Sequence, residues 1–208
     1  MIRAIALVSV EKGADAEATA AALRARAARA GVRASQLGTN LRGSLGGGRF
    51  TWDLALDDAV ALALLLAPLE RARSDAVAFR PRETHVPGAA RRAGVRRTLL
   101  LRVRPGADPA RVAGFEHALL DMPGHIAAIR SWALHRTDPG LWPTRFTHVW
   151  EQEYDDVAGL ERDYMSHPYH WGLVDAFFDP ECPQHVTEAD LAHVYYAAES
   201  SVLAWDLR

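Results

Sequence analysis

The sequence of 208 residues predicts an α+β fold built from two tandem modules, each with the element order β-α-β-β-α-β. Two repeated landmarks support this prediction. The first is the apolar run Ile2–Val10, which is followed by a glycine-containing turn and Asp15. A similar run begins 93 residues later, at Val95, and is followed by Gly106 and Asp108. In each copy the aspartate stands where a helix N-cap is expected.

The second landmark is the tripeptide Arg-Phe-Thr, which opens a strand-like segment at Arg49 and again at Arg145. Each segment runs into an Asp-Asp pair, at 57–58 and at 155–156, that can cap the next helix. Two landmarks in the same order and at nearly the same spacing indicate an internal duplication.

The first module is expected over residues 1–80. Apolar runs predict its strands, and an Ala/Arg-rich segment and an apolar segment predict its helices. The expected elements are a strand at 2–10, a helix from about Asp15 to Ala30, strands at about 32–40 and 49–56, a helix from Asp57 to about Arg71, and a short strand at 75–80.

Residues 81–94 contain two prolines and two glycines and are expected to form an exposed linker. The second module is expected over residues 95–208. Its predicted elements are a strand at 96–104, a helix at 108–121, strands at 126–136 and 145–154, helical segments across 155–178, and a last strand at about 190–198.

A β-α-β-β-α-β unit forms a four-stranded antiparallel sheet with both helices on one face. The strand that begins at Phe146 leaves neither face polar. It should place Phe146, His148 and Trp150 on one side and Thr147 and Val149 on the other. A sheet that is apolar on both faces needs a second layer, so we expect the two modules to pack sheet to sheet.

Composition excludes several classes of protein. The chain is 49% apolar and 24% charged with a formal net charge of −2, which gives no basis for binding nucleic acid or an anionic membrane surface. Cys182 is the only cysteine, so an intrachain disulfide and a cysteine-based zinc cluster are excluded. Because no signal peptide and no apolar run of about 20 residues is present, a cytoplasmic protein is expected.

The Thr147-His148 pair and the stretch from Tyr164 to His170, which reads Tyr-x-x-His-Pro-x-His, carry a resemblance to a known family. They resemble the stress-responsive α/β-barrel proteins of the Dabb type, a branch of the dimeric α+β barrel superfamily. The first module shares the framework, but it has Trp52 where the second has His148 and an apolar segment in place of the motif. The resemblance implies two ferredoxin-like modules packed as an intrachain dimeric α+β barrel.

The resemblance also implies a chemistry. The nearest known activity in the family is of the olivetolic acid cyclase type, a polyketide cyclisation by aldol condensation without cofactor or metal. Its catalytic residues correspond to Tyr164 and His170, and its strand histidine to His148. This sequence has Arg97 where that enzyme has a histidine. We therefore expect His170, Tyr164 and His148 to be catalytic, with no cofactor.

The residue types suit that role. Pro168 makes a continuous helix through the motif unfavourable, so Tyr164 and His170 can both point into a cavity between sheet and helices. A histidine exchanges protons near neutral pH, and a tyrosine hydroxyl can hydrogen-bond an oxygen that becomes an enolate. His167 as a helix cap and His148 as a core histidine are the structural alternatives.

Aromatic residues are concentrated in the second module and indicate an apolar pocket there. The residues expected to contact substrate are His167, Trp150, Trp171, Phe146, Tyr169 and Arg97. The loop from Asp179 to Glu188 is a candidate lid. His117, His135 and His193 are expected on the surface or in packing, and no metal site is expected, since no helical His-x-x-x-His pair or carboxylate cluster accompanies the motif.

The leading hypothesis is a cofactor-independent cyclase, lyase or isomerase that acts on a small carbonyl compound, aromatic or polyketide-like. A ligand-binding stress protein without turnover is the alternative, and a cofactor-free monooxygenase of the same superfamily is a third. The expected partner is a small-molecule substrate. Because the fusion supplies the pairing of two modules, the chain is expected to be a monomeric pseudo-dimer or a homodimer.

Overall fold

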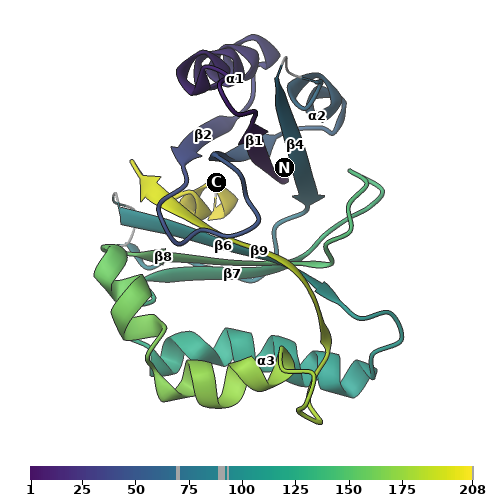
Figure 1. The fold of residues 1–208 in the computed structure, drawn as a ribbon, viewed down its shortest axis with the longest axis vertical. Helices are drawn as coiled ribbons and strands as arrows, with labels where there is room; N and C mark the ends of the chain where they lie inside the picture. The colour runs from purple at the N-terminus through teal and green to yellow at the C-terminus, as the bar shows by residue number, and fades with distance from the viewer. Residues whose placement is uncertain (69–70, 89–91, 93, 208) are drawn as a thin grey trace.

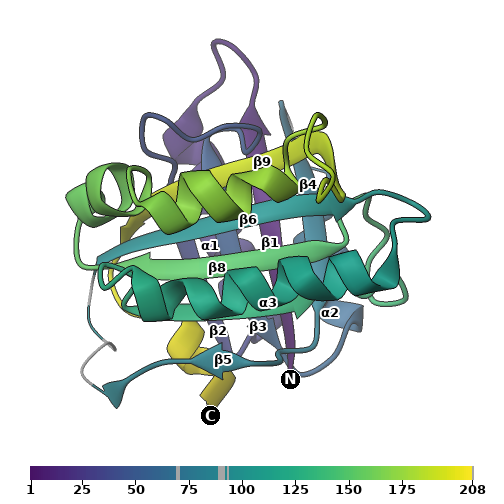
Figure 2. The same cartoon turned by 90° about the horizontal axis from the view of Figure 1, so that it is seen from below.

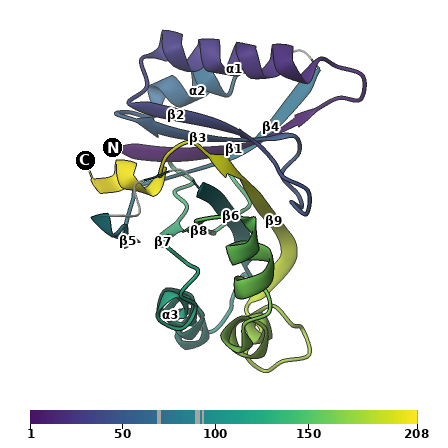
Figure 3. The same ribbon diagram turned by 90° about the vertical axis from the view of Figure 1, so that its left-hand side faces the viewer.

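The computed structural model describes residues 1–68, 71–88, 92 and 94–207. It has an α+β fold in which two antiparallel sheets face each other and the helices lie on the outer sides (Figures 1 and 3). The strands of one sheet run across those of the other (Figure 2). Among the helices of the described residues, none has the length and apolar character needed to cross a bilayer.

The first sheet has the strand order β2-β3-β1-β4. Its strands are β1 (Ile2–Val10), β2 (Ala34–Thr39), β3 (Phe50–Leu56) and β4 (Ala72–Phe79). Helices α1 (Ala16–Ala30) and α2 (Val60–Leu65) cover its outer face (Figure 3).

The second sheet has the order β5-β7-β8-β6-β9. Without the edge strand β5, this is the order of the first sheet. Its strands are β5 (Thr84–His85), β6 (Gly94–Val103), β7 (Ser131–Arg136), β8 (His148–Tyr154) and β9 (Thr187–Ala198). Its outer face is covered by α3 (Pro109–His125) and by short helical segments at Gly159–Tyr164, His170–Val174 and Asp175–Phe177 (Figure 2).

The helix caps follow the sequence. Asp15 accepts the backbone N–H groups of Glu17 and Ala18, and Asp108 accepts that of Ala110. In the Asp-Asp pairs, however, it is the second aspartate that accepts a backbone N–H at the start of the next helical segment. Asp58 accepts the N–H of Val60 at 2.9 Å, and Asp156 accepts that of Gly159 at 2.8 Å. Asp57, where a cap is expected, is instead paired with Arg33 at 3.1 Å.

Several expected boundaries differ from the structure, among them the start of β7, which lies at Ser131 instead of residue 126, and the end of α3, which lies at His125 instead of residue 121. Helix α2 ends at Leu65, earlier than the predicted end near Arg71, and residues 69–70 of that prediction lie outside the described residues. The segment expected as a linker contributes β5, in which Thr84 pairs with Ala133 and His85 stacks on Trp132 at 4.0 Å between ring centroids. The second sheet therefore gains a strand from the connection.

Strand register relates the two sheets differently from the Arg-Phe-Thr landmark. Trp52 lies opposite Ala6 in the first sheet, whereas Trp150 lies opposite Leu99 in the second. Because β1 and β6 match with a spacing of 93 residues, Trp52 corresponds to Trp150 and not to His148. The expected alignment of β3 with β8 is therefore two residues out of register.

An apolar cluster fills part of the space between the sheets, with side chains from β1, β4, β6, β8 and β9. Phe146 belongs to this cluster. It had been expected on the same face as His148 and Trp150 and in contact with substrate. Because β8 begins only at His148, the alternation of a strand does not extend back to Phe146, and its ring packs between the sheets instead.

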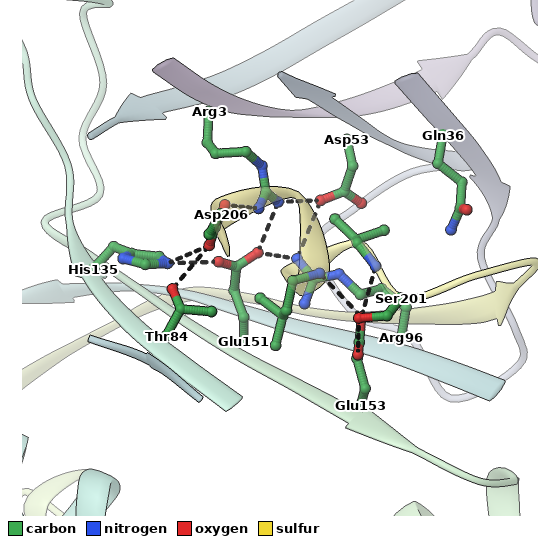
Figure 4. Close-up of polar contacts among 12 residues, drawn as sticks. Arg3, Gln36, Asp53, Thr84, Arg96, His135, Glu151, Glu153, Ser201 and Asp206 are labelled. Carbon is green, nitrogen blue, oxygen red and sulfur yellow. Dashed lines mark hydrogen bonds and ion pairs between the residues drawn. The ribbon is translucent and has the colours of Figure 1, made fainter. Parts of the chain in front are cut away.

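Four charged side chains meet at the centre between the sheets (Figure 4). Arg3 lies 3.2 Å from both Asp53 and Glu151. Arg96 pairs with Asp53 at 3.1 Å and also with Glu151. All four side chains are fully buried. Burial alone would raise the pKa of Glu151, but the charges of Arg96 and Arg3 hold it below its usual range.

The C-terminal turn Leu203–Leu207 closes one end of this cluster (Figures 3 and 4). Asp206 pairs with Arg3 at 2.8 Å and accepts the hydroxyl of Thr84 at 2.9 Å. Glu153 accepts the hydroxyl of Ser201 at 2.7 Å and two backbone N–H groups at the start of the turn. The polar cluster is therefore tied to the last residues of the chain.

Candidate functional site

A cavity of about 270 Å³ lies on the helix-covered side of the second sheet. This exceeds the roughly 150 Å³ that suffices to hold benzene in a protein core. The wall is mostly apolar and polar at one end, where Tyr164, His170, His193 and Asp175 line it. The apolar lining is Leu45, Leu99, Leu119, Trp150, Val174, Phe178 and Leu191.

The motif brings Tyr164 and His170 together through two successive backbone turns. His167 N–H donates to the carbonyl of Tyr164 at 3.2 Å, and His170 N–H donates to the carbonyl of His167 at 2.9 Å. The segments on either side are π-helical, which is a conformation enriched at functional sites. The ring centroids of Tyr164 and His170 are 4.4 Å apart. As the motif predicts, the side chains of Tyr164 and His170 lie together at one cavity.

His170 is buried and has a carboxylate beside it. Its Nε2 lies 3.7 Å from Oδ1 of Asp175, close enough for an ion pair once the ring is protonated. Burial lowers the pKa of His170, the charge of Asp175 opposes this, and the charge of Arg97 adds to the lowering. The ring is therefore neutral at neutral pH, and with its proton on Nε2, Nδ1 keeps a free electron pair. Asp175 was not expected in the site.

Tyr164 is buried against Arg97. The guanidinium of Arg97 lies 5.1 Å from the centre of the Tyr164 ring. Burial raises the pKa of the Tyr164 hydroxyl, and Arg97 opposes this through its charge and a hydrogen bond. The hydroxyl is therefore protonated at neutral pH and can donate to a ligand oxygen.

His193, on β9, lines the cavity, whereas the sequence predicts it on the surface or in packing. Among the described residues, its Nε2, Nδ1 of His170 and Nε1 of Trp150 are buried nitrogens with no hydrogen-bond partner. All three residues line the cavity. Buried polar atoms are normally paired, so unpaired nitrogens around one cavity point to a ligand that pairs them.

We expect His193 to make the protein less stable in acid. Burial, and then Arg97 and His170, lower its pKa from 6.5 to about 3. Between these values the unfolded chain binds a proton that the folded chain does not, so stability falls as pH falls, by up to about 1.4 kcal/mol per pH unit. Urea unfolding of H193Q should show a flatter decline between pH 7 and pH 5 than wild type. The exposed histidine variant H117Q should keep the wild-type slope; equal slopes for all three proteins would contradict the assignment.

The first half of the chain reaches this cavity through the loop between β2 and β3. Leu45 of that loop exchanges backbone hydrogen bonds with His193, at 2.7 and 3.0 Å, and lies at the cavity wall with 64% of its surface exposed. Gly46 has φ of +72°, and an added Cβ would lie 2.8 Å from the carbonyl of Leu191. Glycine there lets the loop lie directly against β9.

Other expected site residues lie elsewhere. His148 binds Glu116 through Nε2 at 2.9 Å and Thr147 through Nδ1 at 2.8 Å. Burial lowers the pKa of His148, while Glu116 opposes this. Both ring nitrogens are thus engaged away from the cavity, as the core-histidine alternative requires. His167 accepts the N–H of Tyr169 at 3.2 Å, which is a capping contact.

Two expected aromatic contacts are not part of the cavity wall. Tyr169 is half-buried, donates its hydroxyl to Asp121 at 3.1 Å and stacks on His125 with centroids 4.2 Å apart. Trp171 is 60% exposed, and its indole N–H donates to the carbonyl of Ser166. Neither residue is among those that line the cavity with His170. Phe178, the residue just before the loop that is expected as a lid, lines the cavity.

Three residues outside this cavity are spaced like metal ligands, but the position of the histidine proton argues against a metal there. His135, Glu151 and Asp206 bring three ligand atoms within 4.8 Å of one another. However, Nδ1 of His135 accepts the backbone N–H of Arg82 at 3.0 Å, so in the neutral ring the proton is on Nε2. That nitrogen lies 3.0 Å from Oε2 of Glu151 and carries the ring proton, so it has no free electron pair for a metal. His135 is therefore part of the buried network of Figure 4.

The first module has a cavity of about 330 Å³ on its own helix-covered side, next to Trp52. Among the described residues that line it, Arg73 is the one with an ionisable side chain. A histidine–tyrosine pair is thus found in the second cavity and not in the described wall of the first.

The two sheets and their outer helices define an α+β protein of ferredoxin-like type. An anthrone oxidase-like protein is similar in structure, with a TM-score of 0.55 at 10% identity over 96% of this chain and 92% of that chain. A monooxygenase-like protein from Listeria innocua has a TM-score of 0.52 at 11% identity over 97% and 96%. A dimeric ferredoxin-like protein of unknown function from Thermobifida fusca is 24% identical over 55% of this chain and 99% of its own, with a TM-score of 0.44. At these identities the likeness concerns the fold alone.

Residues 95–192 match the family model of the stress responsive A/B barrel domain, Dabb. The resemblance carried by the Tyr-x-x-His-Pro-x-His motif is thus accompanied by a family-model match over a little under half of the chain. No curated protein matches the sequence.

Proposed function

We propose that the cavity of the second half is the active site of an acid–base enzyme that needs no cofactor and acts on a small carbonyl compound. The observation that carries this proposal is the pairing of a neutral, buried His170 with a protonated, buried Tyr164 at one end of an apolar cavity. A base and a hydrogen-bond donor at neutral pH are the two groups that enolate formation requires.

In the proposed reaction, Nδ1 of His170 takes a proton from the carbon next to the carbonyl group. The electron pair of that C–H bond moves onto the carbonyl oxygen, which accepts a hydrogen bond from the hydroxyl of Tyr164. The charge of Asp175, 3.7 Å from Nε2, stabilises the imidazolium that forms. The enolate carbon then attacks a second carbonyl, whose oxygen takes the proton from the His170 imidazolium, and the result is an aldol-type cyclisation. The reverse of this step breaks a C–C bond and is a lyase reaction, and return of the proton to another position of the enolate is an isomerisation.

Two finer assignments belong to the same proposal. A cyclisation of the olivetolic acid cyclase type is supported by Tyr164 and His170 at the corresponding positions. A tandem duplication packed as an intrachain barrel is supported by the common strand order of the sheets and by the corresponding pairs Arg33–Asp57 and Arg130–Asp155. In this arrangement the first half is a scaffold, and the chain is a cytoplasmic monomer or a homodimer.

Solvent exchange tests the proposed function. A panel of aryl methyl ketones and β-diketones is incubated in D₂O, and loss of the α-proton signal is followed by NMR. We expect wild type to accelerate exchange for at least one compound, and Y164F to slow it by about 10²–10³-fold, the effect of losing one donor to an oxyanion. No acceleration with any compound that binds would favour a ligand-binding protein without turnover. Oxygen consumption during turnover would favour a monooxygenase, the activity that the name of the similar protein from Listeria innocua suggests.

A further inference from the structure

Arg97 is a buried cation without a carboxylate partner among the described residues. Its side chain projects from β6 to the helix-covered side, and the residue is only 4% exposed. Its hydrogen-bond partners are neutral: the side-chain oxygen of Gln152, at 2.7 Å, and the hydroxyl of Tyr164, while its Nε has none. The Tyr164 ring over which the guanidinium lies is neutral as well. By contrast, both buried arginines between the sheets, Arg3 and Arg96, have two or more carboxylates each.

A buried charge that is not balanced costs several kcal/mol, so proteins rarely retain one without a counter-ion. The cavity next to Arg97 also presents groups that suit a negative oxygen. Trp150 is fully buried, lines the cavity and has an indole N–H with no acceptor. The Tyr164 hydroxyl is a second donor. Tyr164 and Trp150 thus line the cavity with donors, and the guanidinium of Arg97 lies against the Tyr164 ring, 5.1 Å from its centre.

We propose that this cavity binds its ligand as an oxyanion, with Arg97 as the counter-charge: the ligand is a phenolate or enolate oxygen carried on a flat apolar body. This inference rests on the proposed function in that both use one cavity, and it names the substrate class of that site. The oxygen lies at the end formed by Tyr164 and Trp150, and the apolar body lies against Leu99, Leu119 and Phe178.

The other charged groups near the cavity do not cancel Arg97. Asp175 is the one carboxylate among its described lining residues, but its side chain is about half exposed and its charge acts through solvent. Glu161, from the first helical segment, accepts the hydroxyl of Tyr195 on β9 at 2.7 Å. From α3, Glu116 is held by Arg136 and His148. His170 and His193 are neutral, and at Tyr164 the effect of the positive charge of Arg97 exceeds that of the negative charge of Asp175.

p-Nitrophenol tests the inference, because it ionises near neutral pH, its phenolate is coloured, and it fits a cavity of this size. Its absorbance is titrated with pH in the presence of excess protein, and its methyl ether, 4-nitroanisole, is the neutral comparison ligand. We expect wild type to bind the phenolate about tenfold more tightly than the phenol, which lowers the apparent pKa of the bound probe by about one unit. R97M should abolish this preference and still bind 4-nitroanisole, whereas R97K should retain it.

R111M, which removes an exposed arginine from α3, is the matched control and should keep the wild-type preference. The R97M chain is expected to fold, since Gln152 keeps its contact with the hydroxyl of Tyr154 at 2.8 Å, and a thermal unfolding curve checks this. The inference is wrong if wild type binds phenol and phenolate equally, if it binds neither, or if the preference survives in R97M. Since the assay needs no turnover, its outcome is independent of whether α-proton exchange is observed.

Discussion

Replacing Glu151 by glutamine should destabilise the protein by about 3–5 kcal/mol, because one partner of a fully buried charge cluster is removed and the opposite charges remain. Glu151 is in contact with Arg3, Arg96 and His135. In E151Q the Arg96 guanidinium would keep Asp53 as its carboxylate partner, and Arg3 would keep Asp53 and Asp206. The loss of stability would be measured as a shift in the urea midpoint at unchanged m-value, near pH 7.

Two further variants separate charge imbalance from simple loss of a contact. E199Q removes an exposed carboxylate near the end of β9 and should change stability by less than about 0.5 kcal/mol. The double variant R96M/E151L removes one positive and one negative charge and should recover part of the loss, since Arg3 and Asp53 remain paired at 3.2 Å. If E151Q behaves like E199Q, the cluster does not hold the two sheets together.

Replacing His170 by alanine should lower kcat/KM by about 10²–10⁴-fold on any compound whose α-proton wild type exchanges, which is the usual contribution of a positioned general base. The pH dependence of kcat/KM should also identify His170 as the base. Because burial lowers the pKa of His170, the acid limb of the wild-type profile should lie below the usual histidine pKa of 6.5, and the rate should be flat around neutral pH.

H117A is the control for H170A, since His117 is exposed on α3. Its kcat/KM and acid limb should match wild type. Removing Asp175 should act through His170: D175N should move the acid limb to still lower pH, because the opposing charge that raises the His170 pKa is lost. A wild-type profile whose acid limb survives in H170A would assign the base to another group.

The site residues that local sequence could indicate are those held by a motif or by strand alternation. Tyr164 and His170 belong to one short motif. Arg97 and Trp150 lie on adjacent strands, and their side chains are on the same face of the sheet. His193 and Leu45 could not be found this way. The first depends on how β9 pairs with β6, opposite Leu99, and the second on a loop from the other half of the chain.

Similar physical reasons explain the other differences. Asp175 lies five residues after His170, a spacing that brings side chains together in a π-helical turn but not in an α-helix. Phe146 was misplaced because the first residue of β8 is His148. The strand order and most element boundaries follow from apolar runs and helix caps, whereas the buried arginines Arg3 and Arg96 acquire their partners only when the two sheets meet.

The loop that brings Leu45 to β9 has a counterpart. Leu41 and Leu45 donate backbone N–H groups to Tyr195 and His193, and in the opposite direction Asp138, between β7 and β8, donates to Ala78 of β4 at 2.9 Å. Each sheet thus has its last strand covered at the edge by the other half of the chain. Uncovered strand edges are templates for aggregation and for exchange of segments between molecules. Local opening of either loop would therefore expose the unpaired backbone groups of an edge strand. Shortening these loops is expected to make the chain form domain-swapped oligomers.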